Sequence, residues 1–292
     1  MNKEYLEKSE MISRALSDAF PDPAGFSYGV VYEAMRYATL NGGKRLRGVL
    51  MLAVGELCGL EEASMLPFAC AIEMIHASTL IHDDLPCMDD DDFRRGQPSC
   101  HKKFGEDIAL LAGDALYSYA FSYLCRKADR TCFTEAQILD VIQIFLHAGG
   151  ADGVIGGQIL DKMYEKRPCT KEQLLELHGR KTGALFSAIS EVVCILAQPS
   201  PEEQKAVMLY MKRLGLAFQI KDDLLDETGD FTLLGKATHA DQNKSTFVTL
   251  TGVDGSEKYL HETIGDAQNA LSVFGDAALL LWIADFVENR EK

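Results

Sequence analysis

The chain has 292 residues, of which 47% are hydrophobic, and a formal net charge of −15 at pH 7. A chain of this length can bury one large core, so we expect a single domain over residues 1–292. The acidic balance disfavours nucleic acid as a partner, because phosphate contacts need clustered basic residues, but it leaves room for a phosphate-bearing small molecule held by local basic residues or bridging cations.

Helical periodicity dominates the chain, and the expected elements follow in order. The N-terminus, MNKEYLEKSE, is charged and lacks the apolar core of a signal peptide. Residues 66–82, LPFACAIEMIHASTLIH, are apolar nearly all round, which is typical of a helix in the middle of a bundle. Further helices are expected at 107–125, 135–148, 171–197, 202–226 and 256–288.

Two of these helices have recognisable starts. Thr170 with Gln173 predicts a capping box ahead of 171–197, and Ser200 with Pro201 and Glu203 predicts a capped start with a first-turn proline ahead of 202–226. No Asn-Gly or Asp-Gly pair lies between alternating strands. The sequence therefore predicts an all-α fold, a bundle of about ten helices. Loops are expected at 42–48, 94–99, 165–168 and 228–245.

The cysteines and the lengths of the apolar runs bear on the cellular location of the protein. The eight scattered cysteines include no C-x-x-C pair, so neither a zinc site nor a redox motif is indicated, and we expect reduced thiols in a cytoplasmic protein. No apolar run reaches the roughly 18 residues that a membrane helix needs. The best candidate, residues 184–197, is too short and contains Glu191, which predicts a buried helix instead.

The segment LIHDDLPCMDDDDFRRG, residues 80–96, holds six aspartates within ten positions. Pro86 lacks an N–H group, so the preceding helix should end or kink near Asp83 and Asp84. Carboxylates at a helix C-terminus face the negative end of the helix dipole and repel each other. A bound cation would remove both penalties.

Three interpretations of this segment compete. It could be a solvated acidic loop. A calcium loop starting at Asp83 would need glycine at the sixth position and glutamate at the twelfth, where Met88 and Arg94 stand. A magnesium site needs only a few carboxylates together with substrate phosphates, and it predicts a second carboxylate group and nearby basic residues.

A second carboxylate group lies in AFQIKDDLLDE, residues 217–227. Asp222 and Asp226 are four residues apart and share one helix face. If the two aspartate-bearing helices are neighbours, an anionic substrate could be held between them through Mg²⁺. Our hypothesis is that the aspartates bind divalent metal and that the metal binds diphosphate.

Five motifs occur in a fixed order along the chain: GGKRLR (42–47), LIHDDLPCMDDDDFRRG (80–96), GRKTGALF (179–186), AFQIKDDLLD (217–226) and LGK (234–236). Together they resemble the trans-isoprenyl diphosphate synthases over nearly the whole chain. The four residues between the first aspartate pair and the next aspartate resemble the bacterial farnesyl and the plant and bacterial geranylgeranyl diphosphate synthases. The resemblance implies a helical bundle around a deep central cavity, a homodimer, and condensation of an allylic diphosphate with isopentenyl diphosphate.

The resemblance also implies a role for individual residues. Three Mg²⁺ ions would be held by Asp83, Asp84, Asp89 and Asp222. The allylic diphosphate would be bound by Arg94, Lys181 and Lys236. The catalytic groups beside the allylic cation would be Lys181, Thr182 and Gln219. Isopentenyl diphosphate would be bound by Lys44, Arg47, His76 and Arg95.

Three further positions match the family, and several of the residues above have a structural alternative. His82 and Asp114 are expected to orient neighbouring groups, and Gln158 to lie at the cavity edge. Arg94 and Arg95 could simply be counter-charges for the acidic loop. His76 could be a core histidine that hydrogen-bonds to a neighbour, and residues 181–183 could be a kink within a helix.

The sequence departs from the family in two loops. Gly48 follows GGKRLR, where proline is usual, so we expect a less rigid loop exit. After Lys236, His239 replaces a glycine, and only two residues separate Asp241 from Lys244. This loop is shortened, so the roles of Asp241 and Lys244 are not predicted.

Product length depends on the residues below the first aspartates. Ser78 and Thr79 lie five and four residues before Asp83, about 6–7.5 Å deeper along a helix. The small Ser78 alone favours a product longer than fifteen carbons. Tyr117 and Phe121 share a helix face and could close the pocket instead. We expect farnesyl diphosphate, with geranylgeranyl diphosphate as the alternative.

Two other classes of protein share part of this pattern. A class I terpene cyclase also ionises a prenyl diphosphate, but it has no isopentenyl pocket and its second metal motif is usually of mixed Asn/Ser/Glu type. A non-catalytic partner subunit typically loses an aspartate motif. The basic motif at 42–47 and both aspartate motifs are present here, which disfavours both classes.

Overall fold

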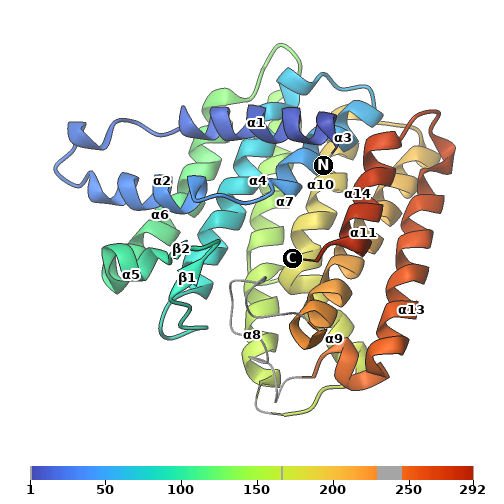
Figure 1. Cartoon of the computed structure of the whole chain (residues 1–292). Coiled ribbons are helices and arrows are strands. Elements are labelled where there is room, and N and C mark those ends of the chain that lie inside the picture. The colour runs from blue at the N-terminus through green and yellow to red at the C-terminus, as the bar shows by residue number, and fades with distance from the viewer. Residues whose placement is uncertain (1, 166, 229–244, 292) are drawn as a thin grey trace. The chain divides into compact units, whose positions relative to one another are not determined.

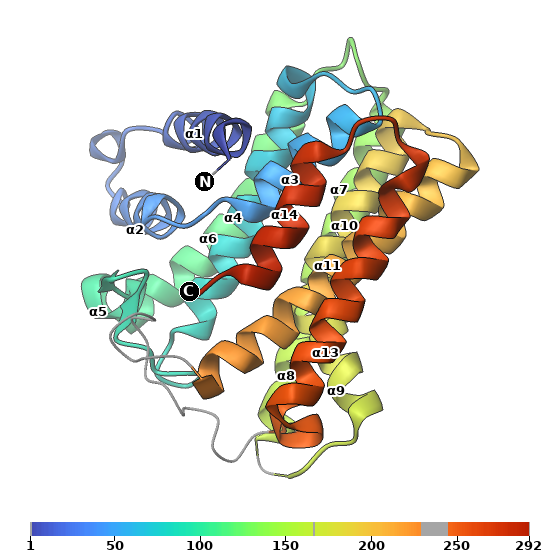
Figure 2. The same cartoon turned by 45° about the vertical axis from the view of Figure 1, so that its right-hand side comes forward.

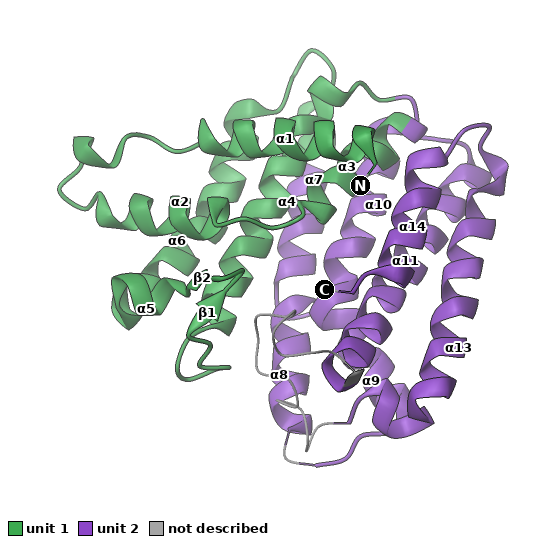
Figure 3. Cartoon of the chain, viewed as in Figure 1, with its two compact units in different colours: residues 1–56, 60–138 green, residues 57–59, 139–292 purple. Residues whose placement is uncertain are grey.

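The structure, a computed structural model, describes residues 2–165, 167–228 and 245–291 and is almost entirely helical (Figure 1). Within these residues the only strands are β1 (Phe93–Arg94) and β2 (Gln97–Pro98), which pair antiparallel. The all-α prediction is therefore confirmed. The chain divides into two compact units, Met1–Glu56 with Leu60–Ile138 and Leu57–Gly59 with Leu139–Lys292 (Figure 3). The expected single domain stays a prediction.

The first unit is built on two long helices, α4 (Glu62–Asp83) and α6 (Glu106–Lys127), which lie side by side (Figure 2). Phe68, Ile72 and Ile75 of α4 are fully buried, as its apolar sequence predicts. The other elements that lie wholly or mainly in this unit are α1 (Lys3–Ser17), η1 (Pro23–Gly25), α2 (Val30–Leu40), α3 (Leu46–Leu57) and α5 (Cys100–Phe104).

The register between α4 and α6 follows from two contacts. His82 Nε2 lies 3.2 Å from the carbonyl oxygen of Leu110, and a Cβ on Gly113 would lie 2.2 Å from the same nitrogen. Near the other end, the side chains of Cys70 and Tyr123 hydrogen-bond to each other. The two helices therefore run antiparallel. One helical turn separates residues four apart, so each further turn down α4 matches one turn up α6.

Helix α4 ends where the aspartates begin, as the sequence predicts. Its last residue is Asp83, and Asp84 caps it by donating its backbone N–H to the carbonyl of Leu80. The strands that follow form a hairpin that the sequence did not predict. Arg95 and Gly96 make its two-residue turn with φ of 55° and 76°, the left-handed pattern that Asn-Gly usually supplies.

The second unit contains α11 (Pro201–Thr228) and α13 (Phe247–Ala270), which lie side by side in both views (Figures 1 and 2). The Tyr210 hydroxyl donates a 2.7 Å hydrogen bond to the Leu280 carbonyl and ties α11 to α14 (Ala278–Asn289). The other elements that lie wholly or mainly in this unit are α7 (Glu135–Gly149), α8 (Val154–Tyr164), α9 (Lys171–His178), η2 (Gly179–Gly183), α10 (Ala184–Ala197) and η3 (Leu271–Val273).

Both predicted helix starts are confirmed, and two predicted helices are interrupted. Thr170 and Gln173 form a reciprocal capping box, and the backbone N–H of Ser200 donates to the carboxylate of Glu203 at 2.8 Å. The helix predicted at 171–197 contains a π-helical turn at Gly179–Gly183. The helix predicted at 256–288 is wrong, because it breaks between α13 and α14, where the Asp276 carboxylate accepts the N–H of Ala278 at 3.1 Å.

The expectation that no run is long enough for a membrane span is also wrong. Glu62–Asp83, Glu106–Lys127 and Glu135–Tyr164 are long and apolar enough by length and composition. In the first, 72% of the apolar window is buried inside the protein, so its character follows from core packing. In the other two the buried share is 39%, which leaves apolar side chains at the surface.

Candidate functional site

The first three predicted metal ligands gather at the end of α4. Asp83 is the last helical residue and is partly exposed, whereas Asp84 is 2% exposed. The backbone N–H of Asp89 donates to the carbonyl of Asp83 at 2.9 Å, so the loop brings Asp89 back to the helix end. Asp89 is exposed.

Arg94 is bound by the acidic segment itself. Its Nε lies 2.9 Å from Asp84 Oδ1 and 3.2 Å from Oδ2, and its Nη2 also bonds to Asp84. The same Nη2 lies 2.8 Å from Asp91 Oδ2. In this structure Arg94 therefore acts as a counter-charge to Asp84, which is the structural alternative for this residue.

Arg95 is held against the predicted basic loop. Its Nη1 donates to the carbonyl of Gly42 at 2.7 Å, and a Cβ on Gly43 would lie 2.5 Å from the guanidinium carbon. Glycine at position 43 thus makes room for the Arg95 side chain. Arg94 and Arg95, together with Asp84, line a cavity of about 20 Å³, which holds roughly one water molecule.

His76 lies close to several arginines of the first unit. Burial and the positive charges of Arg47 and Arg95 hold the pKa of His76 well below its usual value, so the imidazole is neutral near pH 7. Three of the four residues predicted to bind isopentenyl diphosphate are therefore near one another. The fourth, Lys44, is partly exposed, and its carbonyl accepts the Tyr5 hydroxyl at 2.6 Å.

Arg45, which the sequence did not single out, anchors the basic motif. It is 5% exposed, adopts a φ of 53°, and lies 3.7 Å from the carboxylate of Glu73. Glu73 also accepts the backbone N–H of Gly48 at 2.8 Å. Gly48 lies inside α3 rather than at a loop exit, and proline could not donate this bond.

The predicted chain-length residues are distributed over α4 and α6. The hydroxyls of Ser78 and Thr79 donate to the carbonyls of Ile75 and His76 at 2.7 and 2.8 Å, so both are satisfied within their own helix. On α6, the rings of Tyr117 and Phe121 lie 5.2 Å apart, edge to face. Burial raises the pKa of Tyr117.

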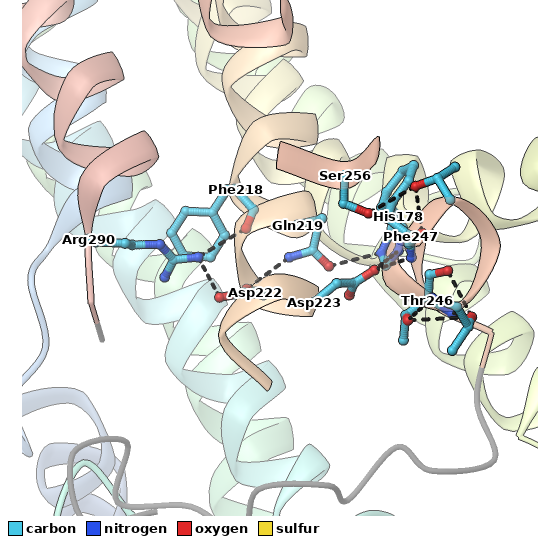
Figure 4. A network of polar contacts seen from close by, with 11 residues as sticks. His178, Phe218, Gln219, Asp222, Asp223, Thr246, Phe247, Ser256 and Arg290 are labelled. Atoms are coloured by element: carbon cyan, nitrogen blue, oxygen red, sulfur yellow. Dashed lines mark hydrogen bonds and ion pairs between the residues drawn. The ribbon is translucent and has the colours of Figure 1, made fainter. Parts of the chain in front are cut away.

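In the second unit, Asp222 of α11 accepts hydrogen bonds from two directions (Figure 4). Gln219 Nε2 donates to Oδ2 at 3.2 Å, and Arg290 Nη2 donates to Oδ1 at 2.5 Å. The Arg290 guanidinium also lies 3.9 Å from the centre of the Phe218 ring. The Asp222 side chain is 44% exposed, so it keeps accessible surface beside these partners.

A second group of contacts continues from Gln219 (Figure 4). Its Oε1 lies 3.0 Å from Nδ1 of His178, the last residue of α9. The His178 ring stacks on Phe247 with centroids 5.4 Å apart. Asp223 accepts the backbone N–H of Phe247 at 2.7 Å and lies 3.7 Å from His178 Nε2. This network joins α9, α11 and the start of α13.

Lys181 and Thr182 lie in the π-helical turn η2, which packs against α11. Lys181 Nζ is 2.5 Å from Asp161 Oδ2 of α8, and Thr182 is 8% exposed. A Cβ on Gly157 would lie 2.2 Å from the Lys181 backbone nitrogen, so glycine allows α8 to approach η2. The predicted diphosphate ligand Lys236 lies outside the described residues.

Some residues around the site were predicted from the sequence, and others were not. His82 Nε2 lies 3.5 Å from Asp114 Oδ1, and Gln158 is half-buried on α8; their roles stay predictions. The polar neighbours of the predicted site residues that the sequence did not identify are Asp91, Asp161, His178, Asp223 and Arg290. His178 directly precedes GRKTGALF, and Arg290 ends IADFVENR, so motif proximity was the available signal.

Magnesium fits the donor chemistry of the predicted metal ligands. Among residues 2–165, 167–228 and 245–291, no three His, Cys, Asp or Glu side chains form a ready metal-binding group. Mg²⁺ commonly binds one or two carboxylates together with waters and substrate phosphates, and it does not need a complete protein cage. The partly exposed carboxylates of Asp83, Asp89 and Asp222 are donors of this kind.

Comparison with known proteins defines the class. The polyprenyl synthetase family model matches residues 29–278. Farnesyl diphosphate synthase of Escherichia coli is 40% identical over 96% of this chain and 95% of its own length. Geranylgeranyl diphosphate synthase of Cyanophora paradoxa is 39% identical over 97% and 94%. The structure of a Helicobacter pylori geranyltransferase complexed with magnesium and isoprenyl diphosphate aligns with a TM-score of 0.83 and 33% identity, over 99% of this chain and 97% of that one.

The chain belongs to the polyprenyl synthetase family. Within that family it is a short-chain trans-prenyl diphosphate synthase, a prenyltransferase of isoprenoid biosynthesis, and the family uses Mg²⁺. Its relatives include both farnesyl and geranylgeranyl types, so similarity alone does not select the product.

Proposed function

We propose that this chain is a cytoplasmic farnesyl diphosphate synthase. It condenses isopentenyl diphosphate with dimethylallyl or geranyl diphosphate and releases diphosphate. The observation that carries this proposal is the grouping of three aspartates at the end of α4, next to the arginines of the hairpin. Geranylgeranyl diphosphate is the second candidate product.

Metal binding is assigned to Asp83, Asp89 and Asp222, with Asp84 beside them. Three Mg²⁺ ions held by these residues would neutralise the allylic diphosphate and make it a better leaving group. The structural role of Asp84 in holding Arg94 agrees with its secondary place in this set.

The protein's own groups bind and orient the two substrates. We assign the allylic diphosphate to Arg94, Lys181 and Lys236. Arg94 and Lys181 are each paired with a carboxylate in this structure, so they must exchange that partner for a phosphate oxygen. We assign isopentenyl diphosphate to Lys44, Arg47, His76 and Arg95. The neutral His76 can donate or accept a hydrogen bond without adding charge.

The reaction then proceeds by ionisation, attack and proton loss. The allylic C–O bond breaks, and diphosphate leaves with the electron pair. Lys181, Thr182 and Gln219 are assigned to the side of the allylic cation. The double bond of isopentenyl diphosphate attacks this cation and forms the new C–C bond. The released diphosphate takes the proton, so no side chain acts as general base.

The antiparallel register of α4 and α6 supports a fifteen-carbon product. His82 lies at the level of Gly113, so one turn deeper Ser78 lies at the level of Tyr117. A further turn brings Met74 to the level of Phe121. An aromatic residue on α6 thus accompanies the small Ser78 and can close the pocket. The alternative rests on Ser78 itself, which leaves space for twenty carbons if Tyr117 turns aside.

Product analysis tests this proposal. The purified chain is incubated with Mg²⁺, isopentenyl diphosphate and either dimethylallyl or geranyl diphosphate, and the dephosphorylated alcohols are identified by mass spectrometry. Farnesol supports the proposal. Geranylgeraniol selects the alternative product. No condensation would revive the terpene cyclase and the non-catalytic subunit as candidate functions.

We also propose that the enzyme is a homodimer. Large apolar side chains are exposed on α6 of the first unit, where Leu110 and Leu111 are 48% and 57% exposed. The second unit exposes Leu139 on α7 and Ile155 and Ile159 on α8, by 56–65%. Within each unit, large exposed apolar side chains of this kind are typical of an interaction surface.

A further inference from the structure

A chain of hydrogen bonds reaches Asp222 from the far side of α11. It begins at His178 Nδ1, passes through the side-chain amide of Gln219, and ends at Asp222 Oδ2 (Figure 4). The two bonds measure 3.0 and 3.2 Å. Asp222 and Gln219 belong to the proposed machinery, but His178 has no assigned role in it.

The direction of each bond is fixed by chemistry. An ionised carboxylate only accepts hydrogen bonds, so Gln219 must turn its NH₂ group toward Asp222. The amide oxygen of Gln219 then faces His178, which must carry a proton on Nδ1 in order to donate. Any ring that lacks this N–H would leave the amide free to rotate, and the oxygen and the NH₂ group could exchange places.

The His178 ring is itself held in place. It is 8% exposed and stacks on Phe247, with an angle of 16° between the ring planes. Asp223 flanks the other edge of the ring, 3.7 Å from Nε2, and binds the first N–H of α13. Nε2 has no hydrogen-bond partner among the described residues. The Nδ1 edge is therefore the one through which His178 forms a hydrogen bond.

We propose that His178 is a positioning residue that acts through Gln219. By donating Nδ1–H it fixes the amide, so that the NH₂ group supports Asp222 in the orientation in which that carboxylate receives metal. This inference rests on the proposed role of Asp222 as a magnesium ligand. Groups that orient a metal ligand from behind typically change metal affinity or activity about 10–100-fold when they are removed.

Two substitutions separate the hydrogen bond from the packing. His178→Phe keeps an aromatic ring for Phe247 but has no N–H to donate. His178→Asn loses the ring, but its amide nitrogen falls near the position of Nδ1 and can donate to Gln219. His178→Gln is the matched partner of His178→Asn, because its longer side chain places the amide nitrogen toward Nε2. This second pair carries the comparison if His178→Phe does not fold.

The first readout is binding of Mg²⁺ with inorganic pyrophosphate to the full chain, measured by calorimetry. We expect affinity to fall about tenfold or more in His178→Phe and His178→Gln, and to stay within about threefold of the native value in His178→Asn. Steady-state kinetics should show the loss in kcat, with KM for isopentenyl diphosphate unchanged. Equal losses in His178→Asn and His178→Gln would mean that the ring is needed only for packing, and the inference would be wrong.

A double-mutant cycle with Gln219→Ala tests the route. If His178 acts through Gln219, adding His178→Phe to Gln219→Ala should cost no further affinity, whereas independent effects would add. Additive losses would overturn the inference. If the native chain neither binds Mg²⁺ with pyrophosphate nor forms a prenyl product, the proposed function fails; native binding with unchanged variants rejects only the role of His178.

Discussion

An arginine pairs with one aspartate of each aspartate motif, Arg94 with Asp84 and Arg290 with Asp222. The two carboxylates differ in how much of their surface stays exposed. Asp84 is 2% exposed, and Arg94 binds it through two nitrogens. Asp222 is bound by a single nitrogen of Arg290, and its side chain is 44% exposed. Asp84 is thus suited to hold a side chain in place, and Asp222 retains surface for an incoming cation.

This difference predicts separate effects on activity and stability. Asp222→Asn should lower kcat by several orders of magnitude, because it removes a charge needed for the metal-bound diphosphate. Asp84→Asn should lower Tm, because it leaves the largely buried Arg94 with only partial compensation, at a cost of about 1–3 kcal/mol. Kinetics and thermal unfolding of both variants check this.

The exposed acid Asp107, at the start of α6, provides the control. Asp107→Asn should leave kcat unchanged. Turnover of Asp222→Asn close to that of the native protein would contradict the metal assignment. The same would follow if Asp83→Asn retained native turnover.

His76 makes stability depend on pH. Its pKa lies well below the usual value in the folded protein, because of burial and nearby arginines, whereas in the unfolded chain it is near 6.5. The unfolded state therefore takes up a proton first as pH falls. The contribution of His76 to stability is complete above about pH 6.5 and declines below it, by up to about 1.4 kcal/mol per pH unit.

Replacing His76 by Asn should flatten this acid limb. Denaturant unfolding between pH 5 and 7, a window set by the unfolded-state pKa of about 6.5, should show a smaller slope than in the native protein. His261 of α13, with a side chain 82% exposed, gives the matched variant His261→Asn. An identical slope in the native protein and His76→Asn would show that His76 is not held neutral.

At the scale of elements, glycine decides how closely α8 approaches η2. A methyl group at Gly157 would lie 2.2 Å from the backbone nitrogen and 2.4 Å from the Cα of Lys181, and backbone cannot move aside as a flexible side chain can. Gly157→Ala should therefore destabilise the fold by about 1–3 kcal/mol and displace Lys181. Both the Tm measured by thermal unfolding and kcat should therefore fall in this variant.

Gly265 in α13 is the comparison site, because nothing lies within 4 Å of a Cβ built there. Gly265→Ala should raise stability slightly, by up to about 1 kcal/mol, since alanine is the better helix former. If Gly157→Ala were as stable as Gly265→Ala, the close packing of α8 on η2 would be refuted.

The α4–α6 pair carries the prediction on product length. Tyr117→Ala removes the ring at the level of Ser78 and should shift the product from farnesyl toward geranylgeranyl diphosphate. Tyr119, two residues on, instead donates its hydroxyl to the Ala19 carbonyl at 2.5 Å and stacks on Phe20. Tyr119→Ala should leave chain length unchanged. Mass spectrometry of the alcohols compares the two, and the same product from both variants would place the pocket floor elsewhere.

Element boundaries were predictable where a local side chain sets them. The capping boxes at Thr170 and Ser200 and the helix end before Pro86 are of this kind. The hairpin turn was not predictable, because Arg95 has a left-handed backbone conformation that arginine rarely adopts. The break before α14 coincides with a cap in which Asp276 accepts the N–H of Ala278. The periodicity of apolar residues does not reveal such a cap.

Site residues were predictable where the motif itself carries the chemistry. Asp83 is the last residue of α4 and Asp222 lies in α11, as their motifs predict, and the backbone of Asp89 bonds to that of Asp83. Their partners were not predictable, because they come from distant sequence. Arg290 is 68 residues from Asp222, and His178 is 41 residues from Gln219. Such pairs depend on how α9, α11 and α14 pack, which no local pattern encodes.

The whole molecule has a net charge of −15, yet its proposed substrates are anions. Binding them therefore depends on local concentrations of positive charge rather than on the overall field. In the first unit, the pKa of His76 is lowered by burial and by the positive charges of four arginines: Arg47, Arg95, Arg94 and Arg45. The same net charge also opposes self-association, so a dimer needs apolar surface to offset it.

That requirement leads to a prediction about assembly. Leu111 of α6 is 57% exposed and lies next to the exposed Leu110. If this face is the dimer interface, Leu111→Glu would bury a charge against an apolar partner and should convert the dimer to a monomer. Light scattering coupled to size-exclusion chromatography measures the change. Leu6→Glu on α1, where the native leucine is 42% exposed, should leave the dimer intact. A native protein that is monomeric at micromolar concentration, or a Leu111→Glu variant that remains dimeric, would exclude this face as the interface.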